Sequence, residues 1–277
     1  MAIQSKFHLA RFKPAFNGAE HAVAYSAGDV LFNWHALEIP RGGCAIRSVT
    51  AIVQGTDGGA ANDKNFSLVF AKSINGVAPP ALPVSNAAFA SEYSVKVRKH
   101  IIGYKFLAAT ETRSTDNEFR AYSLIADGMI DKDESDFDDS RKMAAGFSPI
   151  ILEGDPNYSG TTKGYQTIWV AGIAVEGGAN FGTGLLIDTD GITDYAASAS
   201  VTTLNCDGTQ GHKVFGPGDE LVAADGAVIG TVKTIDYNDT VTSHTTIVLE
   251  SALPSDLVDN DEICFKSPIE LMLGLEY

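Results

Sequence analysis

The sequence is poor in cysteine and contains no long apolar run, and both shortages narrow the class of protein. Its three cysteines, Cys44, Cys206 and Cys264, are far apart and form no CxxC pair, so no disulfide framework is indicated and each is expected to be a small buried side chain. No window approaches eighteen consecutive apolar residues, which argues against a transmembrane helix. Residues 1–6 lack the apolar core of a signal peptide. We therefore expect a protein that is made and folded in a cytoplasm.

Basic residues are also scarce. The chain has 20 Lys and Arg against 35 Asp and Glu, a formal net charge of −15. Such a surface repels nucleic-acid phosphate and anionic lipid, so we expect neither nucleic acid nor a membrane as a partner. The charge is uneven: residues 1–190 carry a net of −4 and residues 191–277 a net of −11. This uneven charge indicates that the two parts of the chain meet different surroundings.

Motifs that carry chemistry are missing as well. There is no phosphate-binding loop, no GxSxG elbow and no HExxH pair, and the six histidines are scattered. The run Asp131–Asp139 holds six carboxylates in nine residues, but Asp136 replaces the glycine and Lys142 the glutamate of an EF-hand loop. A solvated loop is favoured, with a different calcium site or a basic partner as alternatives. We predict no catalytic, cofactor-binding or metal-binding residues, and we expect that the protein is not an enzyme.

What the sequence does contain is a series of short apolar runs bounded by Gly, Pro, Asn and Asp, which is typical of strands and turns. The first two runs, residues 45–53 and 66–71, are separated by a glycine-rich loop and are expected to be antiparallel neighbours. Together the runs predict an all-β protein whose residues 1–195 form an antiparallel, jelly-roll-like β-sandwich. The predicted strands are 45–53, 66–71, 122–126, 150–152 and 167–175.

Residues 196–277 alternate more regularly. Asp225-Gly226 lies between the apolar runs 219–223 and 228–235, which predicts a hairpin with positive φ at both central residues. With further strands at 245–249 and 262–265, this part is expected to be a small β-barrel or sandwich. The last eleven residues are unusually apolar for a chain end, so we expect them to pack onto a domain or to enter a subunit interface.

Two local features have alternative interpretations. The basic stretch Lys96–His100 is unusual on an acidic chain: it is either a solvated face or a segment that docks onto an acidic protein surface. Trp34 and Trp169 lie in apolar strand contexts, so both are expected in the core, whereas a sugar-binding site would expose them.

Two sets of segments carry recognisable motifs. The first set comprises Ala24–Val30, with its AYSAGDV sequence, Ile39–Val49, with its Gly-Gly pair, and Phe66–Phe70. It resembles a family of phage virion proteins that are often head-associated. The other set is similar to a small β module of tailed-phage structural proteins, including those of marine phages: Phe215–Leu221, Ile229–Ile235 and Thr246–Leu249. The shared positions are mainly turn glycines and apolar strand residues.

The resemblance implies a virion structural protein, which we expect to be a capsid decoration or cement protein on the outer head. Its partners would be the major capsid protein or other virion proteins, and further copies of itself, with a trimer as one form. Residues 1–195 would dock on the shell and residues 196–277 would project into solvent. The alternatives are a tail, neck or baseplate component and, from another class, a carbohydrate-binding or receptor-binding module.

Overall fold

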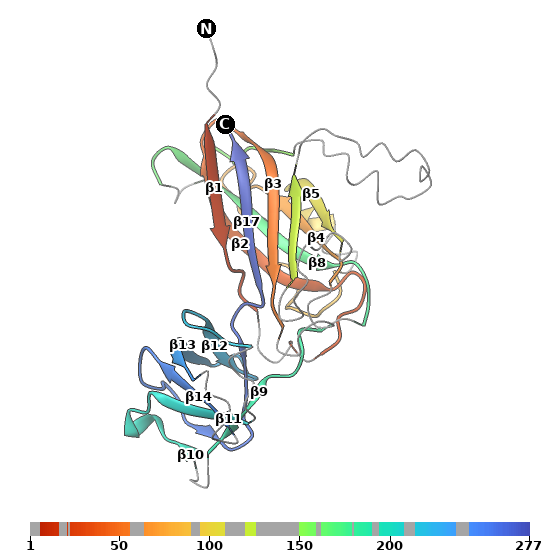
Figure 1. The fold of residues 1–277 in the computed structure, drawn as a ribbon. Helices are drawn as coiled ribbons and strands as arrows, with labels where there is room; N and C mark the ends of the chain where they lie inside the picture. The colour runs from red at the N-terminus through yellow and green to blue at the C-terminus, as the bar shows by residue number, and fades with distance from the viewer. Residues whose placement is uncertain are drawn as a thin grey trace.

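The computed structural model describes residues 6–16, 21, 23–55, 64–89, 95–108, 120–125, 150–158, 162–178, 180–189, 194–207, 214–236 and 244–277. Almost all of their regular structure is β-strand and almost none is helix, which confirms the predicted all-β class. Figure 1 shows two bodies, a long sandwich and a smaller barrel beyond one of its ends. Among these residues, no helix is long and apolar enough to cross a membrane.

The sandwich consists of two antiparallel sheets, one of five strands and one of four. Sheet I has the order β1 (Phe7–Phe12), β17 (Ile269–Glu276), β3 (Cys44–Val53), β6 (Arg120–Ile125), and the short β7 (Ile151–Leu152) also pairs with β3. Sheet II has the order β2 (Val30–Pro40), β8 (Tyr165–Ala174), β4 (Phe66–Ala71), β5 (Ile101–Leu107). The inward-facing residues of both sheets form one apolar core.

The order of these strands is that of a jelly roll. Numbered along the chain, the eight long strands lie as 1-8-3-6 in sheet I and as 2-7-4-5 in sheet II. This is the two-sheet closure found in double Greek-key proteins, in which the first and last strands are neighbours. The predicted jelly-roll-like sandwich is therefore confirmed.

The same topology corrects one local expectation. β3 and β4, which follow each other along the chain, do not pair: β3 lies in sheet I and β4 in sheet II. The connection between them is long enough to cross from one sheet to the other, whereas a two-residue hairpin loop would have kept them adjacent.

The last strand explains the apolar chain end. β17 alternates strictly between buried and half-buried residues, and it pairs with β1 on one side and β3 on the other. The chain end therefore packs back into the sandwich as a central strand. Its pairing with β1 brings together the first and the last strand of the chain.

The smaller body is a closed, six-stranded antiparallel barrel with its own core. Its neighbours in order are β11 (Thr203–Asp207), β14 (His244–Leu249), β13 (Val228–Ile235), β12 (Glu220–Ala223), β16 (Glu262–Phe265) and β9 (Leu185–Asp188). A two-stranded ribbon of β10 (Asp194–Tyr195) and β15 (Leu257–Val258) flanks the barrel. The short 3-10 helix η4 (Ala197–Ala199) follows β10. The predicted small β module is thus a barrel.

The predicted boundary at residue 195 is wrong for both bodies: the barrel begins before it, and the sandwich includes the last strand of the chain. β9, which begins at Leu185, closes the barrel by pairing with β11 and β16. β17 belongs to the sandwich, because its alternating apolar face fills the core between β1 and β3. The barrel, residues 185–266, is therefore an insertion between the last two strands of the jelly roll. It still carries 3 basic and 14 acidic residues, a net of −11.

Three strands in the two bodies each follow a tight turn that contains a Gly-Asp or an Asn-Asp pair. In each, the aspartate carboxylate accepts the backbone N–H of the residue three positions earlier, and the residue before the aspartate has positive φ, which favours Gly or Asn. The turns are Ser26–Asp29 before β2, Gly216–Asp219 before β12 and Val258–Asp261 before β16. The Gly-Asp segments that carry the sequence resemblance are therefore structural turns.

Candidate interaction surfaces

The described residues bring no metal-binding group together. Among them, no group of three His, Cys, Asp or Glu side chains could hold a metal ion. The three cysteines are buried as predicted, and burial raises the pKa of Cys44 to about 11 and of Cys206 and Cys264 to about 12. Thiols with such values remain protonated and unreactive at neutral pH. The acidic run 131–139 lies outside the described residues.

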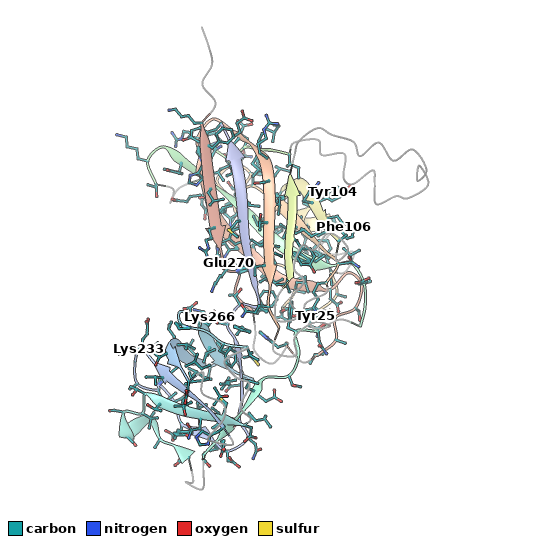
Figure 2. The ribbon with its side chains drawn as sticks, in the orientation of Figure 1. Tyr25, Tyr104, Phe106, Lys233, Lys266 and Glu270 are labelled. Atoms are coloured by element: carbon teal, nitrogen blue, oxygen red, sulfur yellow. The ribbon has the colours of Figure 1, made fainter. Side chains whose placement is uncertain are left out.

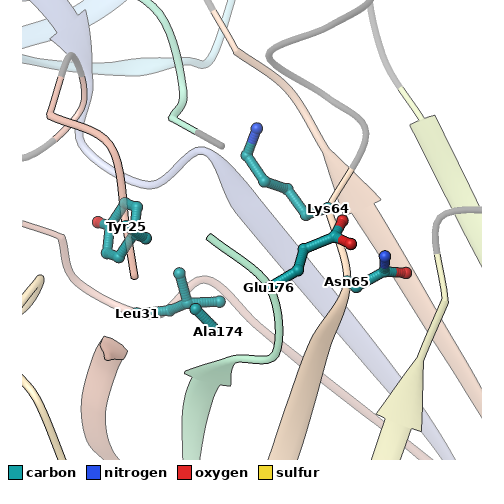
Figure 3. Close-up of a pocket in the computed structure, with 6 residues that line it drawn as sticks. All are labelled: Tyr25, Leu31, Lys64, Asn65, Ala174 and Glu176. Atoms are coloured by element: carbon teal, nitrogen blue, oxygen red, sulfur yellow. The ribbon is translucent and has the colours of Figure 1, made fainter. Parts of the chain in front are cut away.

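A small cavity lies near the end of β8, between Tyr25, Leu31, Lys64 and Glu176 (Figure 3). Its volume is about 10 Å³, which is space for one water molecule at most. Lys64 is buried, with its ammonium group 5.1 Å from the centroid of the Phe181 ring. This cavity is too small to hold a substrate.

Neither tryptophan forms an exposed platform. Trp169 is buried, with the ring of Tyr158 packed edge-on at 4.9 Å. Trp34 is half-buried and donates its indole N–H to the carbonyl of Pro80 at 2.9 Å. The core placement is confirmed for Trp169 and partly so for Trp34, which packs beneath the β4–β5 connection. The exposed aromatic side chain of sheet II is Tyr104, next to the half-buried Phe106 on β5 (Figure 2).

The chain itself covers much of the outer face of sheet II. The connection between β4 and β5 lays Leu82 and Val97 against Val30 and Ala171 in a small apolar cluster. Asn33 fixes the connection by donating to the carbonyl of Leu82 at 3.1 Å. The part of this outer face that belongs to β2 and β8 is thereby covered by residues of the same chain.

The basic stretch Lys96–His100 is held in this connection by two buried anchors. Val97 is fully buried, and His100 is buried with its Nδ1 at 2.9 Å from the carbonyl oxygen of Lys72. Because these two side chains point inward, Lys96, Arg98 and Lys99 are exposed. The stretch thus presents three cations together on a chain of net charge −15.

Over the outer face of sheet I, which we call the open face, no other element of the described residues lies (Figure 1). Phe7 and Leu9 of β1 protrude from it with exposed fractions of 72% and 63%. Ile151 of β7 is 61% exposed at the other side of the sheet. Between them lie the half-buried residues Ala45, Ser48, Thr50, Ile52, Met272 and Gly274.

Four charged side chains of the open face form two ion pairs between strands. Arg11 of β1 pairs with Glu270, and Arg47 of β3 pairs with Glu276. The Arg11 guanidinium lowers the pKa of the Glu270 carboxyl. Together the four contribute no net charge. Arg47 stands out on this face because the pairing register of β3 and β17 shifts beside it.

The open face was not predicted from the sequence. Residues 7–12 are apolar at Phe7 and Leu9 and also at Ala10 and Phe12, so alternation alone does not tell the outward side from the inward one. A signal was present in β17, whose sequence IELMLGLE places both glutamates on the same side.

The two bodies meet near the start of β17. The side-chain amide of Gln54 donates to the carbonyl of Val214 at 3.1 Å, and the amide of Phe16 donates to the carbonyl of Lys266 at 3.3 Å. Behind this junction, His21 is 1% exposed between the rings of Phe16 and Phe181, and neither of its ring nitrogens has a hydrogen-bond partner among the residues that the structure describes. Burial lowers the pKa of His21 to about 4.

Comparison with known proteins adds no relative to this description. No protein-family model matches the chain, and no curated protein matches it. The functional interpretation therefore depends on the surfaces and on the two-body architecture.

Proposed function

We propose that this protein is a structural component of a phage particle, a capsid decoration or cement protein that binds the outer surface of the head. The observation that supports this most is the arrangement of the two bodies. A jelly-roll sandwich, an architecture common in viral capsid proteins, carries an inserted barrel that holds most of the net negative charge. The resemblance of the turn and strand segments to virion proteins points the same way.

The charge distribution suggests which body docks. The barrel, with a net of −11, repels an acidic shell, whereas the sandwich exposes Lys96, Arg98 and Lys99 together. Such a cluster favours an acidic surface on the major capsid protein or another virion protein and steers the encounter at low salt. The barrel would then project into solvent and help to keep particles apart by charge repulsion.

Binding to purified heads tests this directly. The double variant R98E/K99E should reduce co-sedimentation of the protein with heads at least tenfold at low salt, because both side chains are exposed and their reversal leaves the fold intact. The control is Lys233→Glu on the barrel (Figure 2), which also makes the net charge more negative but leaves the docking body unchanged. Equal loss in the control, or no loss in the double variant, would contradict the proposed docking segment.

The same assay assigns the two bodies. Replacement of residues 185–266 by a flexible linker of about ten residues should retain head binding. Truncation at the boundary that the sequence predicted, after residue 195, is not a suitable test, because it also removes β17 from sheet I. Binding to isolated tails but not to heads would keep the virion class and move the protein to the tail, neck or baseplate.

A further inference from the structure

We infer that His21 is an acid-released latch between the sandwich and the barrel. With its ring neutral it holds the two connections that join the bodies, and with its ring protonated it leaves its site and lets both loosen. The inference goes beyond the proposed function and does not depend on it. It rests on the position of His21, 1% exposed behind the junction, and on the residues that surround its ring.

The barrel is attached to the sandwich by two connections (Figure 1). One leads from β8 to β9 through Phe181, and the other leads from β16 to β17 through Lys266. The amide of Phe181 donates to the carbonyl of His21 at 2.8 Å, and the amide of Phe16 donates to the carbonyl of Lys266 at 3.3 Å. Phe16 and His21 therefore each hold one of the two connections.

The His21 ring packs between these two anchors. Its centroid lies 6.2 Å from that of the Phe16 ring and 5.9 Å from that of the Phe181 ring, and the two phenylalanine rings are 5.3 Å apart. Both phenylalanines are buried. Since each ring contacts the other two, His21 cannot leave this aromatic cluster without uncovering the residues that anchor both connections.

The aromatic cluster accommodates the His21 ring only while the ring is neutral. Neither ring nitrogen has a hydrogen-bond partner among the residues that the structure describes, and burial alone lowers the pKa of His21 to about 4. The ammonium group of Lys64 lies 5.1 Å from the centroid of the Phe181 ring, and Tyr25 packs edge-on against the same ring. A proton on His21 therefore adds a buried cation to a cluster that already holds one, and this drives the ring toward water.

The other charged groups of the junction respond differently to acid. Lys13 of the sandwich pairs with Asp219 of the barrel at 3.9 Å, and Lys266 pairs with Glu220 at 2.9 Å. Burial raises the pKa of Asp219, so a falling pH relieves the cost of burying its carboxylate and favours the closed junction. Asp219 thus opposes release, and the loosening in acid is assigned to His21.

The size of the response follows from the two states of the ring. In the latched form the pKa of His21 is lowered to about 4, and a ring released into water has the ordinary value of 6.5. The ratio of loosened to latched molecules should therefore rise about 20-fold between about pH 7 and about pH 5. Both bodies stay folded, because their cores are separate clusters.

Amide hydrogen exchange of the full chain, followed by NMR at about pH 7 and about pH 5 and corrected for the intrinsic exchange rate, measures this opening. The amides of Phe16 and Phe181 report on the two anchors. Their protection factors should fall about 20-fold in the wild type over this range. At both pH values they should stay about tenfold or more below those of β8 in the sandwich and β14 in the barrel.

Two variants assign the response. His21→Phe keeps a ring in the cluster but cannot be protonated, so the amides of Phe16 and Phe181 should keep their protection at about pH 5. The matched control is His35→Phe, at a second histidine whose pKa is lowered by burial and whose ring stacks on Phe12 at 4.7 Å. Because its ring packs on Phe12 rather than on either anchor, this variant should lose protection as the wild type does.

Any one of the following results would overturn the inference. They are protection at Phe16 and Phe181 that is the same at both pH values, a fall that persists in His21→Phe, a fall that His35→Phe also abolishes, or protection equal to that of β8 and β14, which would mean that the anchors open only when the bodies unfold. A His21→Phe chain that fails to fold is replaced in the same experiment by His21→Leu. Head binding by these variants is a separate readout and does not bear on the latch.

Discussion

Leu273, four residues from the end of the chain, lies in register opposite Val49 of β3, and both side chains are fully buried in the sandwich core. On its other side Leu273 pairs with Ala10 of β1. The sandwich is therefore completed only when the last residues of the chain are present. In sequence, the barrel lies between β8 and β17, which are both strands of the sandwich.

A chain that ends at residue 266 should lose the cooperative unfolding of the sandwich, because it lacks the strand between β1 and β3. Leu273→Ala, a milder change, should lower the free energy of unfolding by about 2–5 kcal/mol, as for other buried leucines. Urea denaturation followed by tryptophan fluorescence measures both, since Trp34 and Trp169 both belong to the sandwich. A truncated chain with an unchanged transition would show that β17 is dispensable.

Replacing residues 185–266 by the flexible linker should leave that transition in place. Sheet I and sheet II contain no strand from this range, and the cores of the two bodies are separate clusters. We expect the excised sandwich to lose the junction contacts of Gln54 and Phe16 and the ion pair between Lys13 and Asp219. An unfolded product would mean that the sandwich needs the barrel to fold.

His21 should make the chain sensitive to mild acid. Its folded pKa of about 4 lies below the ordinary value of 6.5 because burial penalises the charged ring. The unfolded chain therefore binds a proton more readily, so stability is full above pH 6.5 and is lost as the pH falls toward 4. Between about pH 7 and about pH 5 the loss from this group should be about 2 kcal/mol.

The variant His21→Phe should remove that part of the pH dependence, measured as the difference in unfolding free energy between about pH 7 and about pH 5. Phe16→Leu, in the same aromatic cluster, is the control: it should lower stability by a similar amount at both pH values. Equal acid sensitivity of His21→Phe and the wild type would assign the loss to other groups.

The glycine-aspartate turn before β12 offers a paired test of backbone conformation. Gly218 has φ +92° and open space around it, so Gly218→Ala should cost about 1–2 kcal/mol through strain alone. Gly216, two residues earlier, is not at positive φ and a β-carbon there meets nothing closer than 3.9 Å. Gly216→Ala should therefore be close to neutral. Equal effects on the thermal midpoint of the barrel would contradict the turn conformation.

The parts of the fold that were predictable from sequence are those set by local chemistry. The Asp225-Gly226 hairpin between β12 and β13 is present, although only Gly226 has positive φ, where positive φ at both central residues was expected. The amide of Gly226 donates to the Ala223 carbonyl and the amide of Ala223 to the Ala227 carbonyl, each at 2.9 Å. This is the pattern of a three-residue loop that ends in a glycine with positive φ, rather than of a two-residue loop. The apolar composition of the last eleven residues likewise predicted a chain end that packs onto a domain or enters an interface, and β17 packs into the sandwich.

Pairing between distant segments could not be read in the same way. Nothing in residues 269–276 specifies β1 and β3 as neighbours, because any half-buried strand presents the same alternation. The boundary at 195 was wrong for this reason: the charge changes near the barrel, but β17 returns to the sandwich. The basic stretch Lys96–His100 was noticed by charge, whereas the anchoring of Val97 and His100 depends on contacts with other segments.

The most direct test of the central claim is localisation on the particle. Phage particles from the parent lysate would be labelled with an antibody against this chain and imaged by electron microscopy. We predict label over the whole head surface. Absence of label from every part of intact particles would contradict the proposed virion role, and glycan binding dependent on the exposed Tyr104 would then be the function to measure.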